Sequence, residues 1–138
     1  MPTKQIFGPV GGWIQDGAII PAELKHLTLV GLADADANPT AAQLVNSSYF
    51  TMTAGAARAF NTPTAANIVA AFVNPTIGTW FKFYIVNLAV GAFAITVTDP
   101  GGIGITLMGQ MAVAQNENQT FLGLITNVAV PAVTIVMA

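Results

Sequence analysis

The sequence contains very little charge. Only 7% of its 138 residues are Asp, Glu, Lys or Arg, whereas about 25% of residues are charged in a typical soluble domain. The basic residues are scattered, at Lys4, Lys25, Arg58 and Lys82. Binding to nucleic acid requires a cluster of basic side chains facing the phosphates. We therefore expect no nucleic-acid partner.

Cysteine is absent and histidine occurs once, so the chain has few of the side chains that enzymes commonly use in catalysis. Without cysteine the chain has no disulfide, no thiolate metal site and no thiol nucleophile. His26 lies beside Leu27 and Leu29 in a strand-like pattern, which favours a structural role. The only serines, Ser47 and Ser48, show no spacing typical of a catalytic triad. The acidic residues show no glycosidase-like pairing and no metal-ligand set. We expect no enzymatic activity, no cofactor and no metal site.

One acidic motif resembles the start of a calcium-binding loop. Asp34, Asp36 and Asn38 have the spacing of the first three ligands of that loop. Pro39 stands where the loop requires glycine, and Val45 stands where it requires a bidentate glutamate. We interpret the motif as a solvated loop rather than a calcium site.

A nearly uncharged stretch, FKFYIVNLAVGAFAITV at residues 81–97, raises the question of a membrane span. A spanning helix needs about 20 consecutive apolar residues, and here Lys82, Asn87 and Gly91 interrupt a shorter run. Apolar side chains recur at every second position, which predicts two strands joined by a short loop. We expect no membrane contact. The predicted core residues of this stretch are Phe81, Phe83, Ile85, Phe93, Ile95 and Val97.

Similar alternation recurs along the rest of the chain. Further strands are predicted over 26–32, 47–54, 103–107, 120–126 and 132–135. The turn signals between the later strands are DPGG at 99–102, QNEN at 115–118 and Pro131. One helix is predicted over 65–72, with Thr62 or Thr64 as its N-cap. Short strands separated by such turns indicate an all-β sandwich that occupies residues 26–138.

The predicted strands lack the charged side chains that normally mark a solvent-facing side. From residue 61 onward the only charged residues are Lys82, Asp99 and Glu117, and the last two lie in predicted turns. Large uncovered apolar surfaces promote aggregation. We therefore expect another copy of the chain to cover part of the sheet surface.

Residues 1–25 form a predicted N-terminal arm. The stretch WIQDGAII at 13–20 resembles a small hairpin around Asp16-Gly17. Such a short segment cannot bury its own large apolar side chains, so it lies either on its own domain or on a neighbouring subunit. The arm residues predicted to contact a partner are Phe7, Trp13, Ile14, Ile19 and Ile20.

The stretch from about Thr62 to Ala138 resembles a module of tailed-bacteriophage structural proteins. The resemblance rests on TPTAANIVAAFVNPTIGTWFKFYIVN, on GGIGITLMG, on the Thr120-Phe121 strand and on the closing TNVAVPAVTIVMA. In order these are a helix, Asn-Pro, an aromatic strand ending in Asn, a Gly-rich turn into an Ile/Leu strand, and a final Pro-Ala-Val-Thr-Ile strand. The similarity covers a little over half of the chain.

This resemblance implies a jelly-roll-like β-sandwich that assembles as a homotrimer. It occurs in capsid decoration (cement) proteins, whose partner is the major capsid protein on the virion surface, and in tail-fibre or spike tips that bind a host receptor. Fibres usually carry a long shaft before the tip, and only about sixty residues precede the module here. The expected function is therefore capsid decoration, with a receptor-binding knob as the alternative.

Overall fold

The computed structural model describes residues 27–101 and 103–138. The described elements, in chain order, are β2 (Thr28–Gly31), α1 (Ala41–Val45), β3 (Ser48–Met52), β4 (Arg58–Asn61), α2 (Ala65–Ala70), β5 (Trp80–Asn87), β6 (Ile95–Thr98), β7 (Ile105–Met108), β8 (Ala112–Val113), β9 (Asn118–Asn127) and β10 (Ala132–Met137). The all-β class that the sequence predicts is confirmed. The described residues contain two short helices where the sequence predicts one.

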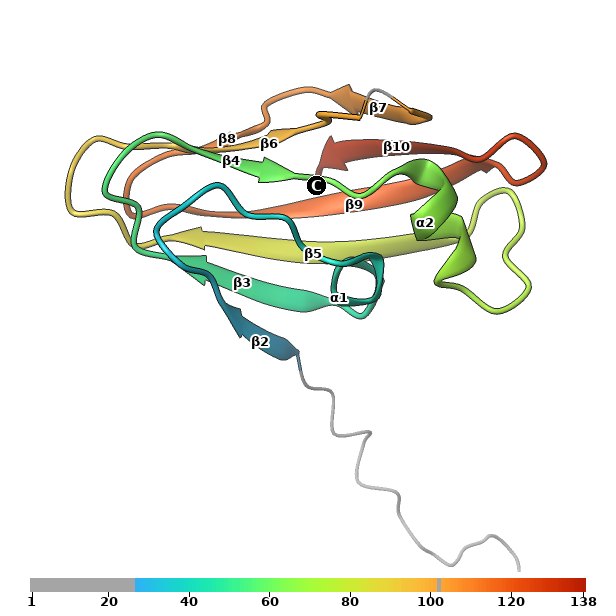
Figure 1. The fold of residues 1–138 in the computed structure, drawn as a ribbon, viewed down its shortest axis with the longest axis horizontal. Coiled ribbons are helices and arrows are strands. Elements are labelled where there is room, and N and C mark those ends of the chain that lie inside the picture. The colour runs from blue at the N-terminus through green and yellow to red at the C-terminus, as the bar shows by residue number, and fades with distance from the viewer. Residues whose placement is uncertain (1–26, 102) are drawn as a thin grey trace, which may run out of the picture.

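The strands form two sheets (Figure 1). The larger sheet has six strands in the order β2-β3-β5-β9-β10-β7, and the smaller has three in the order β4-β6-β8. The smaller sheet packs over one face of the larger, which makes the fold a sandwich. Four of the seven strand pairs within the described residues are parallel. Jelly rolls are built from antiparallel strands, so the jelly-roll detail of the prediction is not confirmed.

The stretch 81–97 does contain two strands, but they lie in different sheets. β5 pairs with β3 and β9 in the larger sheet, whereas β6 pairs with β4 and β8 in the smaller one. Residues 88–94 therefore cross from one layer of the sandwich to the other. This crossing explains why the two strands are not joined by a tight hairpin turn.

The core lies between the two sheets and is rich in phenylalanine. Strand β5 points alternate side chains inward, because successive side chains of a strand lie on opposite faces. Five of the six predicted core residues are at most 2% exposed: Phe81, Phe83, Ile85, Ile95 and Val97. The ring of Phe83 stacks against Phe60 of β4 at 5.7 Å and against Phe121 of β9 at 5.2 Å, measured between ring centroids.

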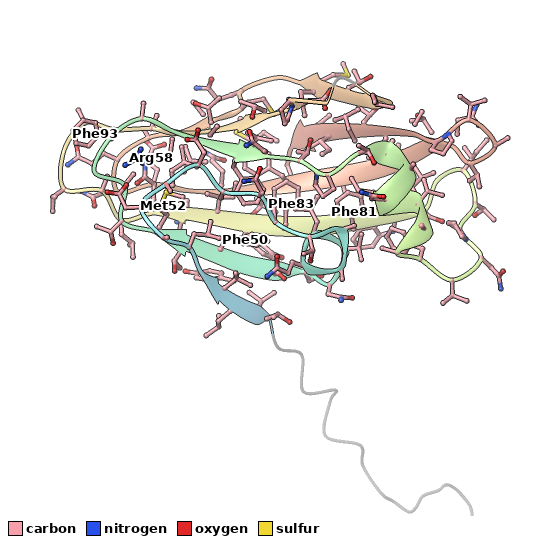
Figure 2. All side chains as sticks on the ribbon, viewed as in Figure 1. Phe50, Met52, Arg58, Phe81, Phe83 and Phe93 are labelled. Carbon is pink, nitrogen blue, oxygen red and sulfur yellow. The ribbon has the colours of Figure 1, made fainter. Side chains whose placement is uncertain are left out.

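The prediction that Phe93 belongs to the core is wrong, since its side chain is 37% exposed at one end of the molecule (Figure 2). Strand β6 begins only at Ile95, so Phe93 lies in the crossing segment and not in the alternating strand. Its N–H donates to the carbonyl of Gly91 at 2.7 Å, which closes a tight local turn. The turn directs the ring toward the backbone of Gly91 rather than between the sheets.

Both helices begin at a threonine that caps them. Thr40 accepts a hydrogen bond from the N–H of Gln43, and the Gln43 side chain accepts one from the N–H of Thr40, which is a capping box. Thr64, one of the two predicted caps, accepts a hydrogen bond from the N–H of Asn67 at 3.3 Å. The helices contribute Leu44 and Ile68 to the core and contact one another, β5 and β10. They therefore extend the cover over the inner face of the larger sheet.

Candidate functional site

The larger sheet has a second face that nothing covers within the described residues. We call it the outer face. Strand register places its members on the side opposite the core: Leu29, Tyr49, Thr51, Trp80, Lys82, Tyr84, Val86, Met108, Thr106, Thr120, Leu122, Leu124, Thr134 and Val136. Lys82 is the only charged residue among them. An almost neutral face of this kind is unusual for a sheet side that meets water.

Several large apolar side chains of the outer face are well exposed in the single chain. Leu29 is 76% exposed, Trp80 59%, Met108 55% and Leu124 38%. Singly exposed apolar residues are common on protein surfaces. Their gathering on one continuous sheet face, together with threonines and tyrosines, is typical of an interaction surface.

A shallow hollow lies on this face where β5 and β9 run side by side. Trp80 and Lys82 of β5 and Leu122 and Leu124 of β9 line it. Register explains the grouping, since Trp80 pairs with Leu124 and Lys82 pairs with Leu122. The Lys82 Nζ lies 5.8 Å from the centroid of the Trp80 ring, within the range of a cation–π contact. The hollow therefore combines an indole, two leucines and one cation.

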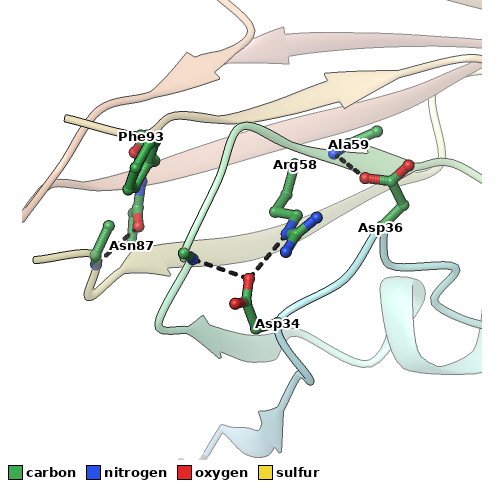
Figure 3. Close-up of polar contacts among 8 residues, drawn as sticks. Asp34, Asp36, Arg58, Ala59, Asn87 and Phe93 are labelled. Atoms are coloured by element: carbon green, nitrogen blue, oxygen red, sulfur yellow. Dashed lines mark hydrogen bonds and ion pairs between the residues drawn. The ribbon is translucent and has the colours of Figure 1, made fainter. Parts of the chain in front are cut away.

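The acidic motif at residues 34–38 fastens a loop to β4 (Figure 3). Asp34 Oδ1 accepts hydrogen bonds from Arg58 Nε at 2.8 Å and from the Gly55 N–H at 2.9 Å. Asp36 Oδ1 accepts one from the Ala59 N–H at 2.9 Å. The motif is thus a solvent-exposed loop, as the sequence predicts, and its aspartates also bind protein groups. Across residues 27–101 and 103–138, no group of three acidic or histidine side chains is placed to hold a metal ion.

The Asp34–Arg58 pair is the one ion pair of the described residues, and it is partly exposed. The hydrogen bond from Arg58 to Asp34, together with the bond from the Gly55 N–H, holds the pKa of the Asp34 carboxyl below its ordinary value. The same contact raises the pKa of Arg58. The pair ties the loop before α1 to the start of β4, and we assign it a structural role.

A buried asparagine fixes the segment that crosses between the sheets. Asn87 is fully buried, and its Nδ2 donates to the carbonyl of Phe93 at 2.7 Å (Figure 3). The same Nδ2 donates to the carbonyl of Val113 at 3.0 Å. Its Oδ1 accepts a hydrogen bond from the Ala89 N–H at 3.0 Å. Every polar atom of the side chain therefore has a partner. The segment held in this way exposes Leu88 and Val90, at 49% and 87%.

The structure brings together residues that the sequence does not single out. Trp80, Leu122 and Leu124 are missed as a group, although their alternation with the buried Phe81, Phe121 and Ile125 is visible in the sequence. What the sequence lacks is the pairing of β5 with β9. The predicted arm contacts, which are Phe7, Trp13, Ile14, Ile19 and Ile20, lie outside the described residues, as does His26.

Comparison with known proteins finds no matching family model, no matching curated protein and no matching solved structure. Among the described helices, none has the length and apolar character needed to cross a membrane.

Proposed function

We propose that this chain is a structural subunit of a virus particle. In this proposal it is a capsid decoration protein that forms trimers on the capsid surface and stabilises contacts between major capsid protein subunits. The observation that carries the proposal is the outer face, a continuous and almost neutral sheet surface with Lys82 as its single charge. Such a face suits a protein that works by binding other protein surfaces.

The hydrophobic effect favours assembly over an isolated monomer in water. Burying apolar surface contributes about 25 cal/mol per Å², and a specific interface buries roughly 1,200–2,000 Å² in total. The outer face offers Leu29, Trp80, Met108 and Leu124 for such an interface. The resemblance of residues 62–138 to phage structural modules selects the virion among the assemblies that would bury this surface.

The mechanism we propose is mechanical. A trimer that bridges several capsid subunits adds buried surface across the seams between them. Three attachments on one particle act together, so the trimer binds more tightly than any one contact would allow. The arm residues Phe7, Trp13, Ile14, Ile19 and Ile20 are the proposed partner contacts of each subunit.

Two measurements test this function. Native mass spectrometry of the full chain should give a trimer. Quantitative mass spectrometry of purified particles should then give a copy number comparable to that of the major capsid protein. A monomer at all concentrations, or absence of the chain from particles, would contradict the proposal.

A second candidate, a tail-fibre or spike knob that binds a host receptor, draws support from the crossing segment. Leu88, Val90 and Phe93 are exposed together at one end of the sandwich, on a loop fixed by Asn87. A rigid apolar loop of this kind suits contact with a receptor protein. Copy number separates the two candidates, because a knob would be present at a small fraction of the capsid protein count.

A further inference from the structure

We propose that the N-terminal arm of one copy docks on the outer face of a neighbouring copy. Trp13 and Ile14 occupy the hollow lined by Trp80, Lys82, Leu122 and Leu124, and Asp16 pairs with Lys82. This inference rests on the trimer proposed above and names the contact that holds it together.

The hollow defines what its occupant must offer. Trp80 and Leu124 require apolar partners, since they are 59% and 38% exposed in the single chain. Lys82 requires an anion, because within the described residues no salt bridge involves it and its ammonium group lies only near the Trp80 ring. A suitable ligand is therefore a short apolar segment with one acidic residue close by.

The arm has this composition. The stretch Trp13-Ile14-Gln15-Asp16 places two large apolar residues within three positions of a carboxylate. Ile19 and Ile20 follow, nearer to β2, and add apolar side chains to cover the tyrosines of β3 and β5. The arm thus matches the hollow both in apolar character and in charge.

The chain also has the length to reach the hollow. The arm leads into β2, which is an edge strand of the same sheet. The hollow lies at β5 and β9, two to three strands from that edge, which is roughly 10–15 Å at the spacing of neighbouring strands. The stretch from Asp16 to Thr28 spans up to about 40 Å when extended. The arm therefore has more than twice the length needed to cross from the β2 edge to the hollow, and the excess leaves it free to extend to a second copy.

Exposed apolar surface elsewhere on the chain favours contact between copies. Apolar side chains are also exposed outside the outer face, among them Val73, Ile77, Val90 and Val130, at 91%, 71%, 87% and 73%. One arm folded onto its own subunit would leave these uncovered, so association is favoured in either case. A contact from the arm of one copy to the face of the next is heterologous, and three such contacts close a ring when successive copies are related by a three-fold rotation. The arrangement thus produces the proposed trimer without a separate interface.

Disulfide trapping in the full chain tests the inference, and the absence of native cysteine makes it clean. Two differently tagged single-cysteine variants, Ile14→Cys and Leu122→Cys, are co-expressed and oxidised. We expect a disulfide-linked heterodimer on a non-reducing gel, with the 14–122 linkage confirmed by peptide mass. The matched control pairs Ile14→Cys with Val73→Cys, which is more exposed but lies outside the outer face. We expect the yield of disulfide-linked heterodimer with Leu122→Cys to exceed the yield of the control pair several-fold.

The double variant Ile14→Cys/Leu122→Cys separates the possible occupants. Arm exchange links chains into dimers and trimers under denaturing, non-reducing conditions. A disulfide confined to single chains would mean that the arm covers its own subunit and would overturn the exchange. Equal yields with the control would overturn the docking site itself. Native mass of the unmodified protein is measured in parallel, so that a trimer without the linkage rejects this inference alone.

A charge exchange provides a test that does not depend on cysteine geometry. Asp16→Lys and Lys82→Asp should each weaken the trimer, seen as a higher dissociation concentration in native mass spectrometry. The double variant Asp16→Lys/Lys82→Asp should recover most of the loss, because the pair is restored with reversed signs. If the losses of trimer stability in the two single variants add in the double variant, the two residues do not contact each other.

Discussion

Leu124 and Ile125 are neighbours in β9, yet Ile125 is fully buried whereas Leu124 is 38% exposed. The same contrast holds between Phe83 and Lys82 in β5. The pleat of each strand sends alternate side chains to opposite faces, and only the inner face meets a second layer. Both faces of the sheet are mostly uncharged, but among residues 27–101 and 103–138 only the inner face is covered by a second layer. The buried inner face accounts for the fold, and we propose that the outer face serves assembly.

The strongest test of this contrast places a charge on each face in turn. Ile125→Lys puts an ammonium group in the core with no anion nearby, and burying an unpaired charge costs several kcal/mol. Because a domain is stable by only about 5–15 kcal/mol, we expect little or no folded protein. Leu124→Lys, one position along, should fold with nearly unchanged stability but fail to form the trimer. Circular dichroism and native mass spectrometry measure the two effects.

This pair of variants can fail in two informative ways. If Leu124→Lys also unfolds, the outer face contributes to the fold of the single chain. If Leu124→Lys assembles normally, the outer face near the hollow is not an interface, and the proposed contact between subunits must lie elsewhere.

A second test compares a polar side chain on the inner face with one at the surface. Asn87→Ala removes a buried amide and leaves the carbonyls of Phe93 and Val113 and the Ala89 N–H without their partner. Unsatisfied buried groups cost about 1–3 kcal/mol each when water cannot reach them, so we expect a loss of at least about 2 kcal/mol in urea unfolding.

The matched control is Asn127→Ala, which also removes a side chain that accepts a backbone hydrogen bond. Asn127 Oδ1 accepts from the Val130 N–H at 3.0 Å, at an exposed site. Water can replace that bond, so the expected loss is about 0.5 kcal/mol or less. Equal losses for the two variants would show that burial of Asn87 does not decide its contribution.

The long alternating strands are predictable from the sequence, but their pairing is not. Strands β5, β9 and β10 carry enough period-two residues to be recognised. Strands β4 and β8 are both missed, because β4 (RAFN) has a single large apolar residue and β8 has only two residues, so neither shows a period. Alternation also says nothing about which strands are neighbours, so the parallel pairs and the separation of β5 from β6 come only from the structure. The missed helix α1 does have a readable signal, the capping box of Thr40 and Gln43.

The same limit applies to the candidate site. Alternation separates Trp80 and Lys82 from Phe81 and Phe83 and correctly places the two phenylalanines in the core, but it does not show which residues of other strands lie beside Trp80 and Lys82. The hollow requires the register of β5 against β9, which joins residues about forty positions apart in sequence. The role of Asp34 likewise depends on β4, a strand whose sequence RAFN shows no alternation of apolar residues. The local sequence thus shows which side chains of one strand share a face, but it does not show which strands together form one surface.

The smallest expected effect concerns the Asp34–Arg58 pair, which is partly exposed to water, unlike the buried side chains of the inner face. The folded-state pKa of Asp34 is lowered by Arg58, so its contribution to stability is complete above the unfolded value of about 3.9. That contribution is lost as the pH falls through the folded pKa. Wild type should therefore lose slightly more thermal stability than Asp34→Asn on acidification from about pH 5 to about pH 2. Arg58→Gln removes the largest cause of the lowered pKa but keeps the bond from the Gly55 N–H, so its melting curves should lie between those of wild type and Asp34→Asn. A wild type with the same acid profile as both variants would show that solvent screening cancels the pair, and the tie between the loop and β4 would then rest on the backbone bonds alone.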